Sequence, residues 1–196
     1  SNIGKHSLSY TYKEKRVMSK KIALVTGATG GIGFQVAKRL GEDGYTVVLN
    51  GIEDDKGAER VEELAALGIE AEYYGFDVTN DEAVTENVKA IGEKYGQIDA
   101  VINNAGGLGG RSPMEEMTTE FYRSVMALNL DSAFFVSRAA IPYLKKTTGG
   151  SIVNYTSNAA WNAGGPGAGI YGVSKAAVNT LTRALAKELA PAGIRV

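Results

Sequence analysis

Short β-rich runs alternate with longer helical patterns along the chain from Lys21 onward. This alternation is typical of right-handed βαβ units, which place parallel strands in one sheet and helices on both of its faces. The sequence therefore predicts an α/β fold with a doubly wound parallel sheet. The expected strands lie at residues 22–26, 46–50, 71–76, 100–103, 151–156 and 194–196.

The predicted helices lie between these strands, at residues 32–43, 54–67, 81–95, 120–145 and 171–189. Gly68, Gly96 and Pro191 follow three of them, and these residue types commonly end helices. Thr79 and Glu82 resemble a capping box in front of the third helix. With 196 residues, 44% of them apolar, the chain can bury the core of one domain.

Composition and charge exclude several classes of function. A net charge of −1 gives no basic field for nucleic acid or an anionic membrane, so we expect small-molecule partners. The absence of cysteine excludes disulfides and thiolate nucleophiles, and it is consistent with a cytoplasmic protein. The single histidine, His6, cannot build a serine–histidine pair or a multi-histidine metal centre within the fold. We therefore expect no metal site.

A glycine-rich turn, TGATGGIG at residues 26–33, joins the first predicted strand to the first helix. In that position glycines let backbone amides and a helix N-terminus approach a pyrophosphate. The spacing fits T-G-x-x-x-G-x-G through Gly27, Gly31 and Gly33, and also G-x-x-G-x-x-G through Gly27, Gly30 and Gly33. The turn thus predicts a dinucleotide site, and the two spacings stay open at this point.

Tyr171 and Lys175 stand four residues apart in YGVSK, at the start of a predicted helix. Positions i and i+4 share one helix face, so the lysine ammonium can lie near the phenol and favour its ionised form. Ser157 lies upstream, at the end of a predicted strand. Together with the glycine-rich turn, this arrangement predicts an oxidoreductase that uses a nicotinamide cofactor.

With NNAG at residues 103–106, the chain resembles the short-chain dehydrogenase/reductase family, in its compact single-domain branch with a Rossmann-like fold. The resemblance runs from about Lys20 to Val196. It rests on TGATGGIG, the Asp77–Val78 pair, NNAG, the asparagine of ALNLDSAFF, the serine of IVNYTS and Y-x-x-x-K, all in family order. The longer, epimerase-like branch shares the tyrosine and lysine but not NNAG in this form.

The resemblance implies catalytic roles for four residues: Asn129, Ser157, Tyr171 and Lys175. Tyr171 would move a proton, and Ser157 would hydrogen-bond the oxygen of a carbonyl or secondary alcohol substrate. Lys175 would hold the nicotinamide ribose, and Asn129 would anchor a water leading from Lys175 to solvent. The span from Ser157 to Tyr171 is longer than in many relatives, so Thr156 is an alternative hydroxyl.

The resemblance also implies a site for NAD(H) or NADP(H), which would exchange hydride with the substrate. Its expected residues are Gly27, Thr29, Gly31, Ile32, Gly33, Asn50, Gly51, Asp77, Val78, Asn104, Ala105, Gly106, Tyr171 and Lys175.

The choice between NAD and NADP depends on the end of the second strand, where an acid binds the ribose hydroxyls of NAD and an arginine accommodates the 2′-phosphate of NADP. Gly51 stands at the acid position, and neither Gly30 nor Ile52 is basic. Glu53 and its acidic neighbours Asp54 and Asp55 would repel a 2′-phosphate. This pattern favours NAD slightly.

Residues 1–19 are polar and mildly basic, without an apolar run long enough for a signal peptide. We interpret them as a leader or flexible arm, with Met18 as the native start, and residues 20–196 as one dinucleotide-binding domain. Val196 ends a strand that has just begun, so we expect the chain to lack the C-terminal substrate-lid segment of its relatives.

In the family, the long helices at 120–145 and 171–189 carry subunit contacts, so we expect a homodimer or homotetramer. Residues 107–114 and 158–170 could line the substrate pocket, and Trp161 either faces it or packs elsewhere. Two other functions remain open: a non-catalytic nucleotide sensor and an epimerase-like enzyme. Retention of all four catalytic positions argues against the sensor, and the chain length argues against the epimerase.

Overall fold

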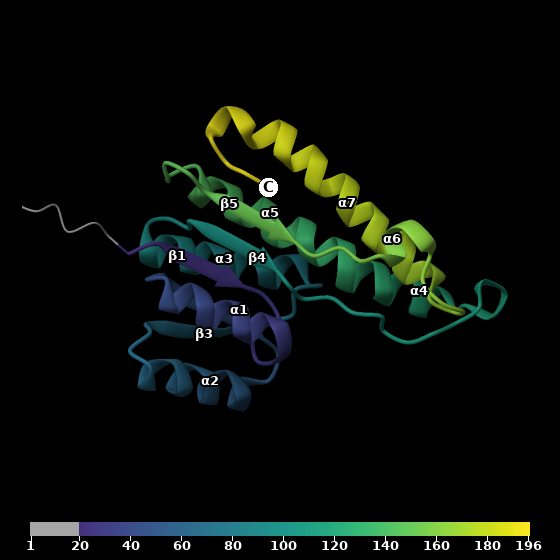
Figure 1. Cartoon of the computed structure of the whole chain (residues 1–196), viewed down its shortest axis with the longest axis horizontal. Helices are drawn as coiled ribbons and strands as arrows, with labels where there is room; N and C mark the ends of the chain where they lie inside the picture. The colour runs from purple at the N-terminus through teal and green to yellow at the C-terminus, as the bar shows by residue number, and fades with distance from the viewer. Residues whose placement is uncertain (1–19) are drawn as a thin grey trace, which may run out of the picture.

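Five parallel strands form the central sheet of the computed structural model, which describes residues 20–196. They are β1 (Ile22–Val25), β2 (Thr46–Gly51), β3 (Ala71–Gly75), β4 (Ala100–Asn103) and β5 (Ser151–Asn154). The strand order is β3-β2-β1-β4-β5, which confirms the predicted doubly wound α/β sheet (Figure 1). The expected leader, with His6 and Met18, lies outside the described residues.

The register brings the carboxyl ends of the central strands level with one another. Val25 pairs with Ile102, and Asn103 pairs with Asn154 on the far side of β4. The glycine-rich turn, the NNAG segment and Ser157 follow β1, β4 and β5 respectively, so they emerge at one edge of the sheet. The chain also reverses its direction of winding between β1 and β4, which is where doubly wound sheets bind ligands.

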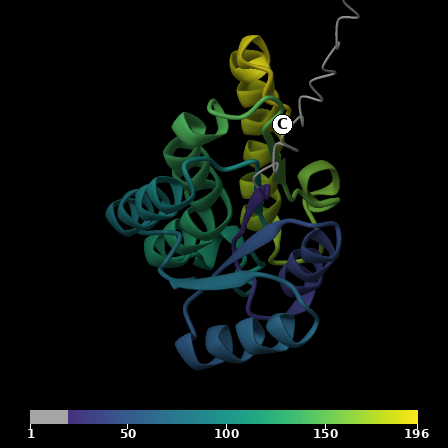
Figure 2. The ribbon, with the colours of Figure 1, turned by 90° about the vertical axis from the view of Figure 1, so that its left-hand side faces the viewer.

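Helices cover both faces of the sheet in two layers (Figure 2). On one face lie α1 (Gly31–Glu42) and α2 (Asp54–Ala66), and on the other α3 (Asp81–Tyr95), α5 (Ser132–Leu144) and α7 (Gly169–Leu189). Side chains alternate along each strand, so Ile22 and Leu24 of β1 join the second layer while Ala23 and Val25 join the first. Burial on both faces explains the continuous apolar run of β1.

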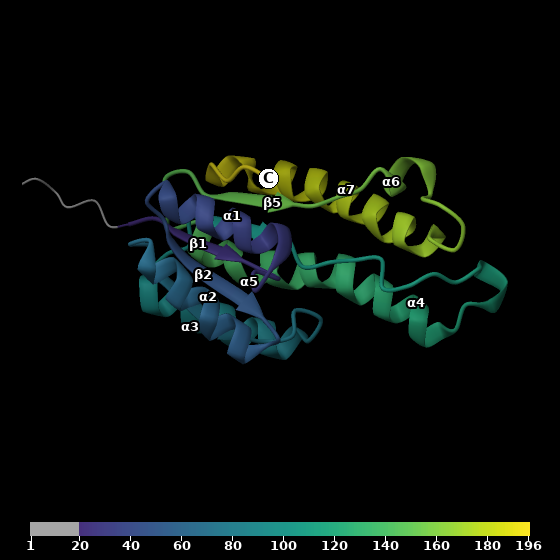
Figure 3. The same ribbon diagram turned by 60° about the horizontal axis from the view of Figure 1, so that its bottom comes forward.

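The predicted helix at 120–145 is not α-helical throughout, because its middle has π-helical geometry. It consists of α4 (Thr119–Met126), a π-helical segment (Ala127–Asp131) and α5, without a break in the chain. In Figure 3, α4, the short α6 (Ala159–Asn162) and the start of α7 extend beyond the carboxyl edge of the sheet. Two 3₁₀ turns complete the described elements, at Met114–Glu116 and Ala190–Ala192. No helix within residues 20–196 is both long and apolar enough to cross a membrane.

Two sequence predictions need correction. The capping box is wrong, because α3 begins at Asp81 and its N-cap is Asn80, whose side chain accepts a hydrogen bond from the amide of Ala83 (3.0 Å). Thr79 instead directs its hydroxyl to Asp77 Oδ1 (2.8 Å). The expected strand at 194–196 reaches the sheet only through an isolated bridge between Arg195 and Ser151.

Candidate active site

The glycine-rich turn is shaped by two glycines with left-handed backbone conformations, Gly27 (φ +58°) and Gly31 (φ +55°). Side chains with a Cβ rarely adopt these angles. A third glycine, Gly33, packs so closely that a methyl group in its place would overlap the carbonyl oxygen of Gly27 and the amide of Asn104. The turn therefore requires glycine at these three positions, two for conformation and one for space.

The start of α1 is suited to bind an anion. Its N-cap, Gly30, offers no side-chain cap, and the first turn carries no acidic residue, so the first backbone N–H groups stay available to a ligand. The positive end of the helix dipole adds to their attraction for phosphate. The residues present thus fit the pyrophosphate of a dinucleotide.

A cavity of about 800 Å³ connects this turn to the predicted catalytic pair. Its lining comes from α1, the carboxyl ends of β4 and β5, and α7. The lining residues are Gly30, Gly31, Ile32, Asn104, Gly106, Gly107, Asn154, Tyr155, Thr156, Tyr171 and Lys175. The structure thus brings together segments that are more than a hundred residues apart in the sequence.

Tyr171 and Lys175 lie on one face of the first turns of α7, as their spacing predicts. The Lys175 ammonium is 5.9 Å from the centroid of the Tyr171 ring and donates a hydrogen bond to the carbonyl of Tyr155 (2.9 Å). It also lies next to Gly106, where a Cβ would be 3.2 Å from Lys175 Nζ. Only 5% of the Lys175 surface is exposed.

Burial lowers the pKa of Lys175 from its ordinary value of 10.5, because removal from water disfavours the charged ammonium. Between the lowered folded-state value and 10.5, the unfolded chain binds more protons, so the free energy of unfolding rises with pH there. Below that interval the cost of burying the charge is fully present. Burial of Lys175 therefore disfavours folding at pH values below that interval.

Replacing Lys175 with methionine is expected to raise the melting temperature near neutral pH, since the substitution removes a buried charge. The difference from the original protein should shrink as the pH rises toward 10.5, because Lys175 then loses its proton. Thermal denaturation of both proteins over this range measures the effect. A difference that stays constant with pH would contradict it.

Asn129 lies in the π-helical segment and is 2% exposed. Its side chain forms a reciprocal pair with Gly107, accepting from the N–H and donating to the carbonyl, each at 2.9 Å. A further hydrogen bond goes to the carbonyl of Val125 (3.0 Å). The side chain thus fixes the loop after β4 beside Lys175, and the water expected at Asn129 stays a prediction.

Ser157 and Thr156 differ in how their hydroxyls are engaged. Ser157 Oγ accepts a hydrogen bond from the amide of Ala159 (3.1 Å), which leaves its own proton available to a substrate oxygen. Thr156 lines the cavity, but its hydroxyl donates to the carbonyl of Lys175 (3.1 Å). This contrast favours Ser157 as the substrate hydrogen-bond donor, although Ser157 is not among the residues that line the cavity.

The two loops expected at the substrate pocket are joined to each other. Arg111 donates to the carbonyl of Pro166 (2.8 Å), and the amide of Ser112 donates to the carbonyl of Gly167 (3.0 Å). A cavity of about 320 Å³ lies between them. Trp161, on α6, lines neither this cavity nor the one at Tyr171, and 79% of its surface is exposed.

At the expected adenosine side, Gly51 ends β2 without space for a side chain, because a Cβ would overlap the methyl group of Thr29. Asp77 is exposed, and its carboxylate accepts hydrogen bonds from the amide and hydroxyl of Thr79, both at 2.8 Å. Val78 is buried in the core. Ala105 is fixed by a hydrogen bond from its amide to the hydroxyl of Thr26 (3.0 Å).

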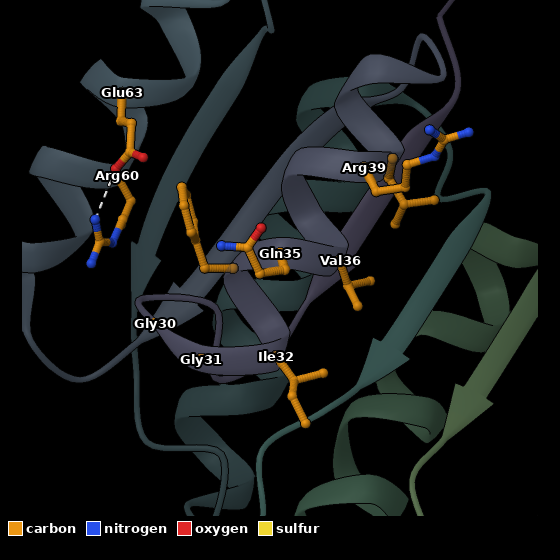
Figure 4. A pocket seen from close by; sticks show the side chains of 10 residues that line it. Gly30, Gly31, Ile32, Gln35, Val36, Arg39, Arg60 and Glu63 are labelled. Atoms are coloured by element: carbon orange, nitrogen blue, oxygen red, sulfur yellow. Dashed lines mark hydrogen bonds and ion pairs between the residues drawn. The ribbon is translucent and has the colours of Figure 1, made fainter.

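No motif in the sequence points to Arg60, which reaches the glycine-rich turn from α2. Its Nε donates to the carbonyl of Thr29 (3.0 Å), and it pairs with Glu63 (2.8 Å) above the ring of Phe34. Arg60, Glu63 and Phe34 line a second cavity, of about 820 Å³, on the outer side of α1 (Figure 4). This cavity contains neither Tyr171 nor Lys175, so the candidate active site is the cavity on the other side of the turn.

The parallel sheet, its strand order and the helices on both faces define a domain of the Rossmann type. A family model described as short chain dehydrogenase matches residues 21–196. The chain therefore belongs to the short-chain dehydrogenase/reductase family, which confirms the resemblance seen in its motifs.

Among curated proteins, the chain is 41% identical over 175 residues to a 3β-hydroxysteroid dehydrogenase of Mediterraneibacter gnavus. The match covers 89% of this chain but only 63% of that protein, so the chain spans less than two thirds of this relative's length. Among solved structures, it is similar to NADH-dependent reductase A1-R′ complexed with NAD (TM-score 0.86, 36% identity, 90% of this chain and 76% of that one). A metagenomic short-chain oxidoreductase in complex with NADP matches with a TM-score of 0.84 at 31% identity, over 90% and 79% of the two chains.

Proposed function

We propose that the protein is an NAD(P)-dependent oxidoreductase that interconverts a carbonyl compound and the corresponding secondary alcohol. The observation that carries this proposal is the single cavity that holds Tyr171, Lys175 and the start of the glycine-rich turn. Membership of the short-chain dehydrogenase/reductase family supports it. The names of the relatives include a hydroxysteroid dehydrogenase and an NADH-dependent reductase, both consistent with this reaction class.

The site residues of this chain would have distinct roles in the reaction. A bound nicotinamide cofactor supplies or accepts hydride. Tyr171 gives a proton to the substrate oxygen during reduction and takes it back during oxidation, while Ser157 donates a hydrogen bond to that oxygen. Lys175 binds the nicotinamide ribose and holds its ammonium 5.9 Å from the centroid of the Tyr171 ring.

Binding of the cofactor would use the amides at the start of α1 for the pyrophosphate. Asp77 and Val78 would flank the adenine, and the segment from Asn104 to Gly106 would lie along the adenosine. Asn129 would hold the loop that carries Gly107.

We also propose self-association, which the exposed apolar side chains of Tyr122, Phe134 and Val173 on α4, α5 and α7 support.

We propose that NAD(H) is preferred over NADP(H). The exposed acidic side chains at residues 53–55 follow β2 and would repel a 2′-phosphate, while Arg60 is already engaged by Glu63 and Thr29. The expected dissociation constant is lower for NADH than for NADPH by about fivefold, or roughly 1 kcal/mol, the scale of one like-charge interaction in a solvated site.

Titration with NADH and NADPH, followed through the fluorescence of the reduced nicotinamide itself, measures this preference. A panel of ketones and secondary alcohols, read by the absorbance of the reduced cofactor, then tests turnover. Tighter binding of NADPH would overturn the cofactor preference. Failure of both cofactors to bind would overturn the proposed function itself.

A further inference from the structure

Asn50 is a polar residue near the carboxyl end of β2, and it is followed only by Gly51 in that strand. Its neighbours in the strand, Val48 and Leu49, are apolar and fully buried, and Asn50 itself is only 2% exposed. Burial of an amide costs free energy unless its donors and acceptor are paired. The buried amide of Asn50 therefore calls for an explanation, and Asn50 is not among the residues that line the cavity.

The partners of Asn50 lie in two segments that border the proposed cofactor site. Its Oδ1 accepts a hydrogen bond from the amide of Gly27 (3.3 Å), and its Nδ2 donates to the carbonyl of Phe76 (2.8 Å). A longer contact joins Nδ2 to the carbonyl of Tyr74 (3.5 Å). The side chain thus connects the glycine-rich turn with the residue that precedes Asp77.

The backbone of Asn50 reinforces the same connection. Its carbonyl accepts from the amide of Ala28 (2.8 Å), while the carbonyl of the following residue, Gly51, accepts from the amide of Phe76 (3.1 Å). The sheet pairing of Asn50 with Tyr74 requires only backbone groups. Sheet formation therefore does not account for the side-chain amide.

Gly27 is held from two sides. Asn50 binds its N–H, and Asn104, which follows β4, donates from Nδ2 to its carbonyl (3.0 Å). Gly27 has φ +58° and no side chain, so its conformation is permissive and depends on partners of this kind. Without them the turn would sample other conformations, and binding a ligand would have to restrict it again.

We propose that Asn50 is a positioning residue for the cofactor. It aligns the glycine-rich turn, which would bind the pyrophosphate, with the segment from Phe76 to Val78, which would flank the adenine. Asn50 acts through Gly27 and Phe76 and does not touch the cofactor. This inference rests on the proposed function, because it assigns the turn to a dinucleotide.

The test uses Asn50→Ala, with Asn87→Ala as the matched control. Asn87, on α3, is half-buried and also donates from Nδ2 to a backbone carbonyl, that of Ala83 (2.9 Å), but it is remote from the turn. Asn50→Ala is expected to raise the dissociation constant for NADH about tenfold, or ~1.4 kcal/mol. The effect should fall on the dissociation constant and on KM for the cofactor more than on kcat, and Asn87→Ala should leave both unchanged.

A purely structural role would lower the melting temperature and the yield of folded protein, but it would leave the NADH affinity of the folded fraction unchanged. Should Asn50→Ala not fold, Asn50→Ser takes its place, since a serine hydroxyl is too short to join Gly27 to Phe76. Unchanged NADH affinity in the folded variant would overturn the positioning role while the proposed function stands. If the original protein binds neither NADH nor NADPH, the proposed function fails and this inference fails with it.

Discussion

Replacing Tyr171 with phenylalanine is expected to lower kcat by about 10²- to 10⁴-fold while the affinity for NADH stays within about twofold, the rate loss being the usual contribution of a general acid or base. The substitution removes the hydroxyl that would exchange a proton with the substrate oxygen. It leaves the ring over which Lys175 lies and the hydrogen bond from Lys175 to Tyr155. This variant should therefore bind NADH normally but turn over substrate slowly.

The measurement is steady-state turnover with the best substrate of the panel, together with an NADH titration of the same preparation. Tyr45→Phe is the matched control, because Tyr45 precedes β2 at the edge of the sheet opposite the proposed site. Retained turnover in Tyr171→Phe would remove the proton-transfer role from Tyr171.

Gly33→Ala is expected to destabilise the protein without cofactor, by about 1–3 kcal/mol for an overpacked position. The added methyl group would overlap the backbone carbonyl of Gly27 and the side-chain amide of Asn104. Neither can move freely, because Asn104 Nδ2 also donates to the carbonyls of Thr26 and Gly27. Melting temperatures should fall by roughly 2–12 °C for a chain of this size.

Gly30→Ala provides the comparison within the same turn. Its backbone is extended (φ −171°), and a Cβ there meets no atom within 4 Å in the described residues. Thermal denaturation of the free proteins should therefore show little change for Gly30→Ala. Equal destabilisation by the two alanines would mean that the turn responds to any added side chain, and the close contact between Gly33 and Asn104 would not be the cause.

The fold was predictable because it depends on patterns that are local in the sequence. Buried parallel strands read as apolar runs, and the glycine-rich turn stands directly between such a run and a helix. The pairing of Tyr171 with Lys175 also follows from helix geometry alone. Each of these features needs only neighbouring residues to be recognised.

The remaining features depend on contacts between distant segments. The hydrogen bond from Arg60 to the carbonyl of Thr29 depends on how α2 packs beside the turn, and no short motif predicts it. The π-helical geometry around Asn129 arises without a proline or glycine in that segment. For Asn50, the sequence placed the residue at the expected cofactor site, but only the structure shows that its amide is buried and engaged by Gly27 and Phe76.

Because residue 106 is a glycine, its neighbours Asn129 and Lys175 limit which substitutions this position can accept. A Cβ at that position would be 2.8 Å from Asn129 Oδ1 and 3.2 Å from Lys175 Nζ, so both polar groups use the space that a single methyl group would fill. A mutation at residue 106 therefore displaces two functional groups at once. A larger residue at position 106 can therefore be accommodated only if both neighbouring side chains shift or change with it.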